Sequence, residues 1–540
     1  MKSFFPFVFL FLSHFSFSQN VGEQIKLRLE GVQETGKLEL RGRGIREVEF
    51  IKDFYSKRSF EPLWINDGDL SELAYELRYE IGQARYDGLN SLDYHLFLIQ
   101  AFFESIEANK KSGFEVPEED LADLELFLSD AVIQFALHLD QGRINPRTLK
   151  QSWNIPKKVS TFDPLIFLNK VEKSQELRPF LIELYPEFPI YTKGREVIRD
   201  LEEKMDQADF DWSELRSNKS LKVGDSHSLI PEIRRRLAFW DYWKGEDLDN
   251  KEYDSLLLES VLNYQEDKGL AVDGVLGKNT FAALNQSPQN LISQIAVNLE
   301  RLRWLDDSKM KSKSILVNIP GYELVFWDKG ETVFSSKVIV GEYKNQTPVF
   351  QASMSHLIFS PYWNVPESIV YKELIPSIRR NPNYLARNNM EVLSYSGKKV
   401  DPSTVNWKAR SIPYLIRQNP GPSNSLGLVK FMFPNPYNVY IHDTPAKHLF
   451  DRENRSLSHG CIRLARPLDF AKFLLKDQEE WTEEKIKEAM SQDHEVRVEL
   501  TTAIPVYVLY MTLWEDEFGN PQFRRDIYGR DPELLSRLGK

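Results

Sequence analysis

The N-terminal half of the chain has the apolar spacing of amphipathic helices. Over residues 121–139, apolar side chains recur every third or fourth position, which gives a helix one apolar face. The positions are Leu121, Leu124, Leu128, Val132, Phe135 and Leu139. Gly142 then supplies a helix stop. We therefore expect residues 19–215 to form an all-helical scaffold domain.

A smaller helical unit is predicted over residues 220–287. One apolar stripe is formed by Ile230, Ile233, Leu237 and Trp240. Residues 255–267 predict a second helix, and a turn-rich loop follows over 269–277. Thr280 lies near the start of a short third helix that ends at about Asn285. The unit is therefore expected to contain three helices.

Beyond this unit the pattern changes to that of β-strands. Runs rich in β-branched and aromatic residues predict strands at 315–319, 323–327, 333–340, 359–363, 439–442 and 505–513. Asp328, Lys329 and Gly330 mark a hairpin turn between the second and third of these strands. We expect a mainly β domain over 312–515 and a C-terminal extension over 516–540. The expected fold class is therefore α+β.

A long insertion interrupts the predicted β domain over residues 367–428. Its content of Pro, Asn, Ser and Gly indicates partial order, with one helix near 367–380. Long insertions beside a site are often lids or binding elements. The segment is therefore a candidate cap.

The first residues have the features of an export signal. A basic start and a short apolar run over 4–12 precede Ser16 and Ser18, the small residues of a cleavage site after Ser18. The run is too short to span a bilayer, and no later run reaches ~18 apolar residues. No cysteine lies near the cleavage point, which excludes a lipoprotein anchor. We expect residues 1–18 to be a signal peptide and the mature chain to be exported; the alternative is a buried N-terminal helix.

Composition limits the function further. A chain of 540 residues is too long for one ordinary core, so about two or three domains are expected. Its 41% apolar and 12% aromatic content favours packed domains over disorder. The formal net charge of −11 argues against non-specific binding to nucleic acid, which is itself a polyanion.

The chain contains one cysteine, Cys461, so no intrachain disulfide can form. It lies 19 residues after His442, within the segment Ser458-His459-Gly460-Cys461-Ile462-Arg463-Leu464. A thiol becomes a strong nucleophile as the thiolate, and a neighbouring imidazole can accept its proton. Gly460 permits close backbone approach, and the N–H groups of Gly460 and Cys461 are candidates for an oxyanion hole. The Arg463 cation is a candidate partner for a substrate carboxylate.

Other interpretations of these residues are open at this point. Zinc-binding residue types gather here, although their spacings match no zinc pattern: His442, His448, His459 and Cys461. Cys461 could instead be a small core residue, with the histidines on the surface. The site could also bind without catalysing.

The segment around Cys461 resembles the catalytic signature of the L,D-transpeptidase (YkuD-type) family. That signature is a histidine followed by S/T-H-G-C-x-R/N, which His442 and residues 458–463 match. Further segments are similar to the long, Gram-negative form of the family: 360–366, 419–427, 504–507 and 526–531. Residues 272–277 resemble the peptidoglycan-binding-like domain of many wall enzymes, or a spacer of the same fold. The resemblance covers nearly the whole mature chain and implies a helical scaffold, this small domain and a capping insertion.

The resemblance also implies roles for individual residues. Cys461 is the nucleophile, and His442 is the general base, which the backbone carbonyl of Asp443 orients. The implied catalytic residues are Cys461, His442, Gly460 and His459. The implied substrate-binding residues are Tyr440, Arg463 and Asp443. His448 has no implied catalytic role, and neither a metal nor a cofactor is expected.

The implied reaction is acyl transfer between peptidoglycan stem peptides. Cys461 attacks the carbonyl of the third stem residue, typically a diamino acid such as meso-diaminopimelate, and expels the terminal D-Ala. The side-chain amine of a second stem then resolves the thioester and leaves a 3→3 cross-link. The expected partners are donor tetrapeptides and acceptor stems, with wall synthases as further candidates. The expected location is the periplasm, and carbapenems are expected to acylate Cys461.

Two alternatives to the transpeptidase are kept. A thiol L,D-carboxypeptidase or endopeptidase would form the same thioester and use water as the acceptor. A non-catalytic wall-binding scaffold would not need the thiol, so Cys461→Ala separates it from an enzyme.

Overall fold

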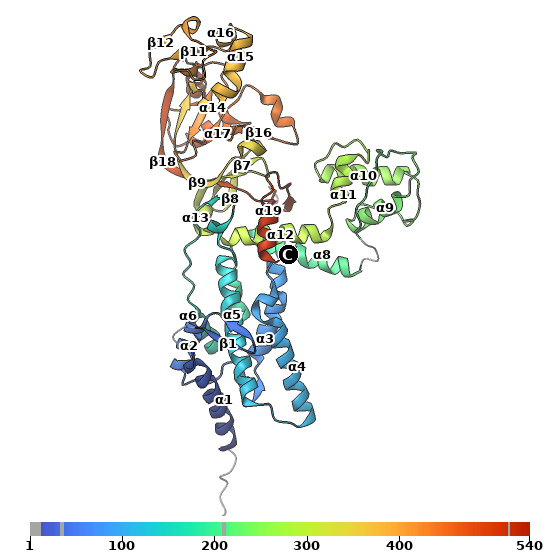
Figure 1. Ribbon diagram of the computed structural model, residues 1–540. Coiled ribbons are helices and arrows are strands. Elements are labelled where there is room, and N and C mark those ends of the chain that lie inside the picture. The colour runs from blue at the N-terminus through green and yellow to red at the C-terminus, as the bar shows by residue number, and fades with distance from the viewer. Residues whose placement is uncertain (1–11, 33–36, 208–211, 517–518, 540) are drawn as a thin grey trace, which may run out of the picture.

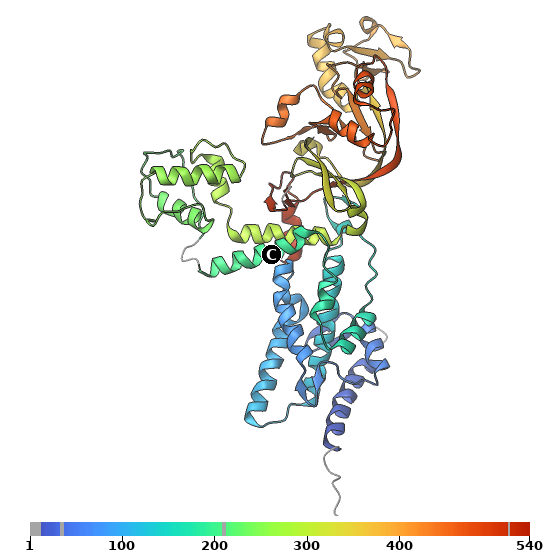
Figure 2. The same ribbon diagram turned by 180° about the vertical axis from the view of Figure 1, so that it is seen from behind.

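The chain folds into several parts, and the buried apolar residues form separate cores. The computed structural model describes residues 12–32, 37–207, 212–516 and 519–539. The N-terminal helices lie at one end of the molecule and the β-rich domain at the other, with α12 (Pro288–Arg303) between them (Figure 1). The small helical unit stands to one side, as the view from behind also shows (Figure 2). None of the described helices has the length and apolar composition of a membrane-spanning segment.

The scaffold is helical, as the apolar spacing predicts. Its helices are α1 (Leu12–Glu30), α2 (Val48–Lys57), α3 (Glu72–Gly82), α4 (Leu96–Ser112), α5 (Glu118–Gln141), α6 (Pro164–Ser174), α7 (Arg178–Ile182) and α8 (Pro189–Gln207). Acidic residues occupy the first turn of α5, where they favour the positive end of the helix dipole. Gly142 ends α5 with φ +75°, a conformation that suits glycine.

Short strands in the scaffold depart from the all-helical prediction. They are β1 (Leu38–Leu40), β2 (Arg43–Ile45), β3 (Ile65–Asn66), β4 (Asp69–Leu70) and β5 (Trp153–Asn154). Two-residue turns with positive φ, Arg41-Gly42 and Asp67-Gly68, join the first four strands into hairpins. β5 pairs in parallel with β9 (Val349–Phe359) of the β-rich domain, so the scaffold contributes to that sheet.

The predicted signal peptide lies mostly outside the described residues. Residues 1–11 are not described, and α1 begins at Leu12, before the predicted cleavage point after Ser18. The export signal therefore stays a prediction.

The small unit contains the three helices that the sequence predicts. They are α9 (Ile230–Phe239), α10 (Ser255–Asp267) and α11 (Lys278–Leu284). The side chain of Gln265 organises the loop between the last two helices. It accepts the Gly274 N–H at 2.9 Å and donates to the Val275 carbonyl at 3.0 Å.

The β-rich domain is built around one sheet. Its strands are β6 (Lys313–Asn318), β7 (Glu323–Asp328), β8 (Glu331–Gly341), β9, β14 (Val429–Met432), β15 (Ile441–His442), β16 (Ser456–Ser458), β17 (Ile462–Leu464) and β18 (Val496–Leu509). β14 pairs with both β15 and β9, so the path β14-β15-β17-β8-β7-β6-β18-β9 closes on itself. Lys329 and Gly330, both with positive φ, form the predicted turn between β7 and β8. Helices α17 (Pro467–Leu474) and α18 (Glu483–Ala489) complete the domain, and Phe470 of α17 packs on Phe334 of β8.

The insertion has a fold of its own, where the sequence predicts partial order. Its elements are α14 (Glu367–Ile369), the π-helical turn η5 (Val370–Leu374), α15 (Ile375–Arg380), α16 (Tyr384–Arg387), β11 (Met390–Leu393), β12 (Lys399–Val400) and β13 (Leu415–Gln418). With β10 (Trp363–Asn364) the strands form a sheet in the order β10-β13-β11-β12. A separate apolar core, which includes Leu374, Val392 and Ile416, lies inside it. Because so small a core needs few apolar residues, the amino-acid composition of the insertion does not reveal it.

Residues 288–311 fall between the predicted domains, yet they pack against several parts of the molecule. They form α12 and most of α13 (Asp307–Ser312). α12 packs against α5, α8 and the C-terminal helix α19 (Asp531–Leu538). Its fully buried Arg303 donates to the carbonyl of Asp87 and lies 3.0 Å from the Glu300 carboxylate. The C-terminal extension adds β20 (Pro521–Phe523), which pairs with β19 (Leu513–Glu515).

Candidate active site

A parallel strand pair brings four of the predicted residues to one face. In the pairing of β15 with β17, His442 lies opposite Arg463. Side chains alternate along a strand, so residues two positions apart share a face. Tyr440 therefore lies on the face of His442, and Cys461 lies on the face of Arg463. The Tyr440 and His442 ring centroids are 5.6 Å apart.

His442 is buried as a neutral base. Its Nδ1 lies 2.5 Å from the carbonyl oxygen of Asp443, the partner that the resemblance implies. Nδ1 therefore carries the ring proton, and Nε2 is left as an acceptor. Burial, aided by the Arg463 cation, lowers the pKa of His442 to about 3. The ring is consequently uncharged near neutral pH.

Cys461 is a free, partly buried thiol. Its Sγ lies 3.7 Å from the carbonyl oxygen of Asn438, to which the thiol donates. Burial raises the pKa of Cys461, while Tyr440 and the Arg463 cation act in the opposite direction. Among the described residues, no hydrogen bond joins Sγ to His442. Activation therefore requires the thiol to turn from Asn438 towards Nε2 of His442.

Arg463 is a half-buried cation beside the thiol. Burial lowers the pKa of Arg463, and the charge of a Cys461 thiolate would raise it. In the described part of the chain Arg463 makes no ion pair, and its Nε has no hydrogen-bond partner. A half-buried cation is costly unless an anion accompanies it. The site is therefore suited to a ligand carboxylate.

Side-chain hydrogen bonds fix the turn before the thiol. Ser458 Oγ donates to the Cys461 carbonyl at 2.6 Å and accepts the Gly460 N–H at 3.1 Å. Since its N–H is already bonded, Gly460 does not offer the oxyanion donor predicted from the sequence. Gly460 has φ +115°, where a side chain would be strained. Within the described residues the Cys461 N–H has no acceptor, so this group is the donor available to an oxyanion.

The Asp443 side chain anchors a neighbouring loop. Its carboxylate accepts the Leu428 N–H at 2.9 Å and the Thr444 N–H at 2.7 Å, and it also pairs with Lys447. A Cβ at Gly427 would lie 2.3 Å from this buried carboxylate. The structure therefore differs from the predicted substrate-binding role. Asp443 acts on the site through its backbone carbonyl.

Known families account for the domain that carries these residues. Residues 312–498 match the family described as L,D-transpeptidase catalytic domain. The chain carries an L,D-transpeptidase catalytic domain. Residues 49–197 match the family described as Scaffold domain, and residues 226–284 match the one described as "Putative peptidoglycan binding domain".

One curated relative and several solved structures are similar to this chain. The protein named "Putative L,D-transpeptidase" from Haemophilus influenzae is 34% identical over 274 residues, which are 49% of this chain and 55% of the relative. The chain thus spans about half the length of the curated relative it matches. An L,D-transpeptidase structure from Mycobacterium smegmatis is 15% identical, with coverage of 36% of this chain and 58% of that chain and a TM-score of 0.19. An L,D-transpeptidase structure from Stackebrandtia nassauensis is 14% identical. The match covers 55% of this chain and 97% of that chain, with a TM-score of 0.19.

His459 connects the L,D-transpeptidase signature to the insertion. Its Nε2 lies 2.7 Å from Oε1 of Glu373 on η5, and the two side chains are 46% and 51% exposed. The His459 ring therefore faces the insertion, whereas the resemblance implies a catalytic role for this residue. The two residues are 86 positions apart, so spacing gives no signal of this contact.

Two further residues near the thiol are absent from the sequence prediction. Asn438 follows a Pro-Asn-Pro-Tyr run and has φ +54°, so the turn composition is a signal for its unusual backbone but not for its contact with Sγ. Thr347 donates to the Gly460 carbonyl at 2.8 Å, and no local pattern indicates it.

The described residues include no group of three or more His, Cys, Asp or Glu arranged to hold a metal ion. The zinc interpretation of His442, His448, His459 and Cys461 therefore gains no support from the structure.

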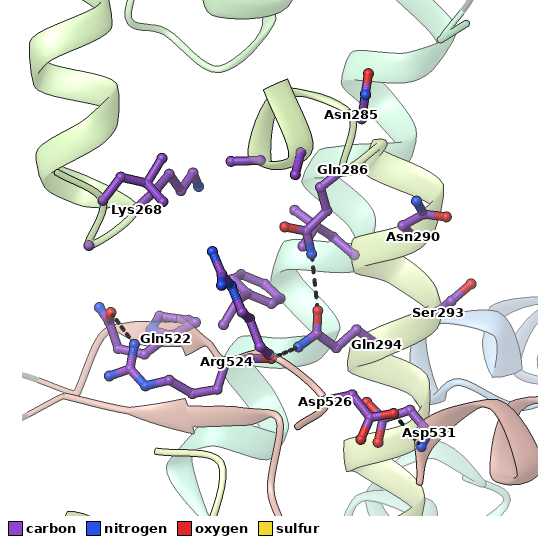
Figure 3. Close-up of a pocket in the computed structure, with 18 of the residues that line it drawn as sticks. Lys268, Asn285, Gln286, Asn290, Ser293, Gln294, Gln522, Arg524, Asp526 and Asp531 are labelled. Carbon is purple, nitrogen blue, oxygen red and sulfur yellow. Dashed lines mark hydrogen bonds between the residues drawn. The ribbon is translucent and has the colours of Figure 1, made fainter. Parts of the chain in front are cut away.

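One sizeable cavity lies away from the thiol. It has a volume of about 1230 Å³ and lies between the peptidoglycan-binding domain, α12 and the C-terminal segment (Figure 3). Amides and cations line it, including Lys268, Asn290 and Arg524, and Gln294 donates to the Arg524 carbonyl at 2.8 Å. No cysteine or histidine is among the residues described at its walls, so it is a candidate for binding and not for nucleophilic catalysis.

Proposed function

We propose that this L,D-transpeptidase domain forms 3→3 cross-links between peptidoglycan stem peptides through a thioester on Cys461. One observation carries the proposal: the strand pair sets a thiol, a neutral imidazole and a cation without an ion pair among the described residues on a single face. These are the parts that acyl transfer to a thiol needs, namely a nucleophile, a base and a group that orients an anionic substrate.

In the first step, Nε2 of His442 accepts the thiol proton and Sγ attacks the carbonyl carbon of the third residue of the donor tetrapeptide. The Cys461 N–H donates to the oxyanion that develops. The C–N bond to the terminal D-Ala then breaks, and His442 returns the proton to the departing amine. Arg463 binds a carboxylate of the donor and so helps to fix the scissile bond beside Sγ.

In the second step, the side-chain amine of a diamino acid in the acceptor stem attacks the thioester. His442 accepts a proton from that amine, an amide bond forms, and the sulfur leaves and is reprotonated. The energy of the donor amide is kept in the thioester, so the reaction needs no nucleotide, metal or cofactor.

The remaining parts of the chain have supporting roles in this proposal. Tyr440 borders the thiol, and the insertion caps the pocket through the contact between Glu373 and His459. The family match of residues 226–284 supports binding of the wall polymer by the small helical domain. Action in the periplasm after export through the signal peptide completes the proposal.

The test is product analysis by mass spectrometry. The protein without residues 1–18 is incubated with disaccharide tetrapeptides, and Cys461→Ala serves as the control. We expect a cross-linked dimer that has lost one D-Ala, and no product from Cys461→Ala. Tripeptide without dimer would support the hydrolase alternative, in which water is the acceptor. Unchanged tetrapeptide from a folded native protein would support the scaffold alternative.

A further inference from the structure

Two buried hydroxyls connect the C-terminal extension to the turn that carries the nucleophile. Thr347 lies in the loop between β8 and β9, and Tyr528 lies between β20 and α19. They are 181 positions apart, and both side chains are fully buried. Neither belongs to the strand pair that holds Cys461 and His442.

The two hydroxyls form a continuous series of hydrogen bonds. Tyr528 donates to the Gly341 carbonyl at 2.5 Å and accepts the Thr347 N–H at 3.2 Å. The Thr347 hydroxyl accepts the Gly341 N–H at 2.9 Å and donates to the Gly460 carbonyl at 2.8 Å. Each hydroxyl thus donates once and accepts once, so its hydrogen has one defined direction.

The last of these bonds fixes the peptide between Gly460 and Cys461. In a planar trans peptide, the carbonyl and the following N–H point in opposite directions. Since the Gly460 carbonyl is tied to Thr347, the Cys461 N–H is turned away from Thr347, and it has no acceptor among the described residues. A donor oriented before the reaction stabilises an oxyanion without the cost of reorganisation.

We propose that Thr347 and Tyr528 are positioning residues of the oxyanion hole. Thr347 sets the plane of the Gly460–Cys461 peptide, and Tyr528 sets Thr347. The inference rests on the proposed acyl transfer at Cys461 and adds to it the residues that aim its oxyanion donor. It also makes the C-terminal extension part of the catalytic apparatus.

Tyr528 is itself well anchored. Its N–H donates to the Tyr510 hydroxyl at 2.8 Å, and the two rings stack with centroids 5.6 Å apart. Nearby, the Arg530 guanidinium donates to the side chain of Gln346 at 3.1 Å, one residue before Thr347. Gly341 cannot be used as a probe, because a Cβ there would lie 2.0 Å from the Asn345 carbonyl oxygen.

The test compares two reactions of the same thiol in the full-length mature protein. Acylation by a carbapenem passes through an oxyanion, whereas alkylation by iodoacetamide does not. Thr347→Val should slow acylation about 10- to 100-fold and change alkylation less than about two-fold, because the oxyanion donor is misaligned while the thiol is untouched. Thr347→Ser keeps the hydroxyl and should restore acylation. Tyr528→Phe should also slow acylation.

The matched control is Tyr94→Phe, which removes a buried scaffold hydroxyl that lies 2.9 Å from His138. It should react like the native protein. Thermal melting of each variant checks folding, and Tyr528→Phe carries the test if Thr347→Val does not fold. Native rates for folded Thr347→Val or Tyr528→Phe would overturn the proposal, as would equal losses in the valine and serine variants. A native protein that is alkylated but never acylated would instead overturn the proposed function, and this inference with it.

Discussion

His442 Nδ1 lies 2.5 Å from the carbonyl oxygen of Asp443, the next residue in the chain. A backbone group therefore fixes the tautomer of the base, and no side-chain substitution removes that group. The Asp443 carboxylate is used elsewhere, where it accepts the Leu428 N–H at 2.9 Å. The orientation of the His442 ring therefore does not depend on the charge of the Asp443 carboxylate.

Loss of the base should cost far more than neutralising Asp443. His442→Ala removes the proton acceptor and should slow acylation of Cys461 about 10²- to 10⁴-fold. Asp443→Asn keeps the carbonyl and should lower stability by about 1–3 kcal/mol through weaker bonds to the loop, with little change in the acylation rate of the folded protein. Stopped-flow acylation and thermal melting of both variants check this. A rate loss in Asp443→Asn as large as that in His442→Ala would assign the carboxylate a catalytic role.

Acylation should show no titration at the ordinary pKa of histidine, which is about 6.5. Burial lowers the pKa of His442 to about 3, so the base is neutral across the mildly acidic range. As the pH falls towards that value the ring gains a proton and the rate should fall. Acylation rates measured from about pH 4 to about pH 8 should therefore lack a midpoint near 6.5. A clear midpoint there would mean that His442 is not desolvated in the working enzyme.

Arg463→Gln should weaken donor binding more than it slows chemistry. The guanidinium is unpaired among the described residues, and a charge-assisted bond to a carboxylate is worth about 1.5–3 kcal/mol, or roughly 10- to 100-fold in KM. Arg466→Gln is the control, because Arg466 is exposed and already paired with Asp469 at 2.9 Å. Steady-state kinetics with a tetrapeptide donor measure the effects on KM and kcat separately. An unchanged KM in Arg463→Gln would remove the carboxylate contact from the mechanism.

Glu373→Gln should loosen the insertion without destabilising the protein. Both partners of the Glu373–His459 pair are about half exposed, and such pairs contribute about 0.2–1 kcal/mol. The melting temperature should hardly change, while hydrogen exchange over residues 367–380 should become faster. Glu367→Gln, in the same helical segment, should have no such effect. Equal exchange in both variants would show that the pair does not hold the insertion closed.

Glu300→Gln should destabilise the connection between scaffold and catalytic domain. Glu300 is fully buried, accepts the Ile144 N–H at 2.7 Å and lies 3.0 Å from Arg303. Leaving that buried cation without its charge partner should cost about 3–5 kcal/mol, seen as a lower melting temperature. The partly exposed Glu533, paired with Arg537 at 2.9 Å, gives the control Glu533→Gln. Identical melting temperatures for the two variants would contradict the claim that Glu300 stabilises the connection between the scaffold and the catalytic domain.

Regular local patterns were enough to predict some of the helices and strands. The second helix of the small domain, Ser255–Asp267, has the predicted bounds, and the turn at Lys329 and Gly330 joins the predicted strands. Such elements depend on residues a few positions apart. Two-residue strands such as Ile65–Asn66 and the core of the insertion have too few residues for a periodic signal.

The sequence by itself determined which groups were available for the chemistry: one thiol at Cys461, a histidine 19 residues earlier and a glycine that permits the tight turn. Only the tertiary structure decided how those groups are used. It directs Sγ to a carbonyl 23 positions away, occupies the Gly460 N–H, and ties the Gly460 carbonyl to a hydroxyl 113 positions away. These hydrogen bonds depend on where strands and loops meet in space, and chain spacing does not encode a contact between segments that only the folded sheet brings together.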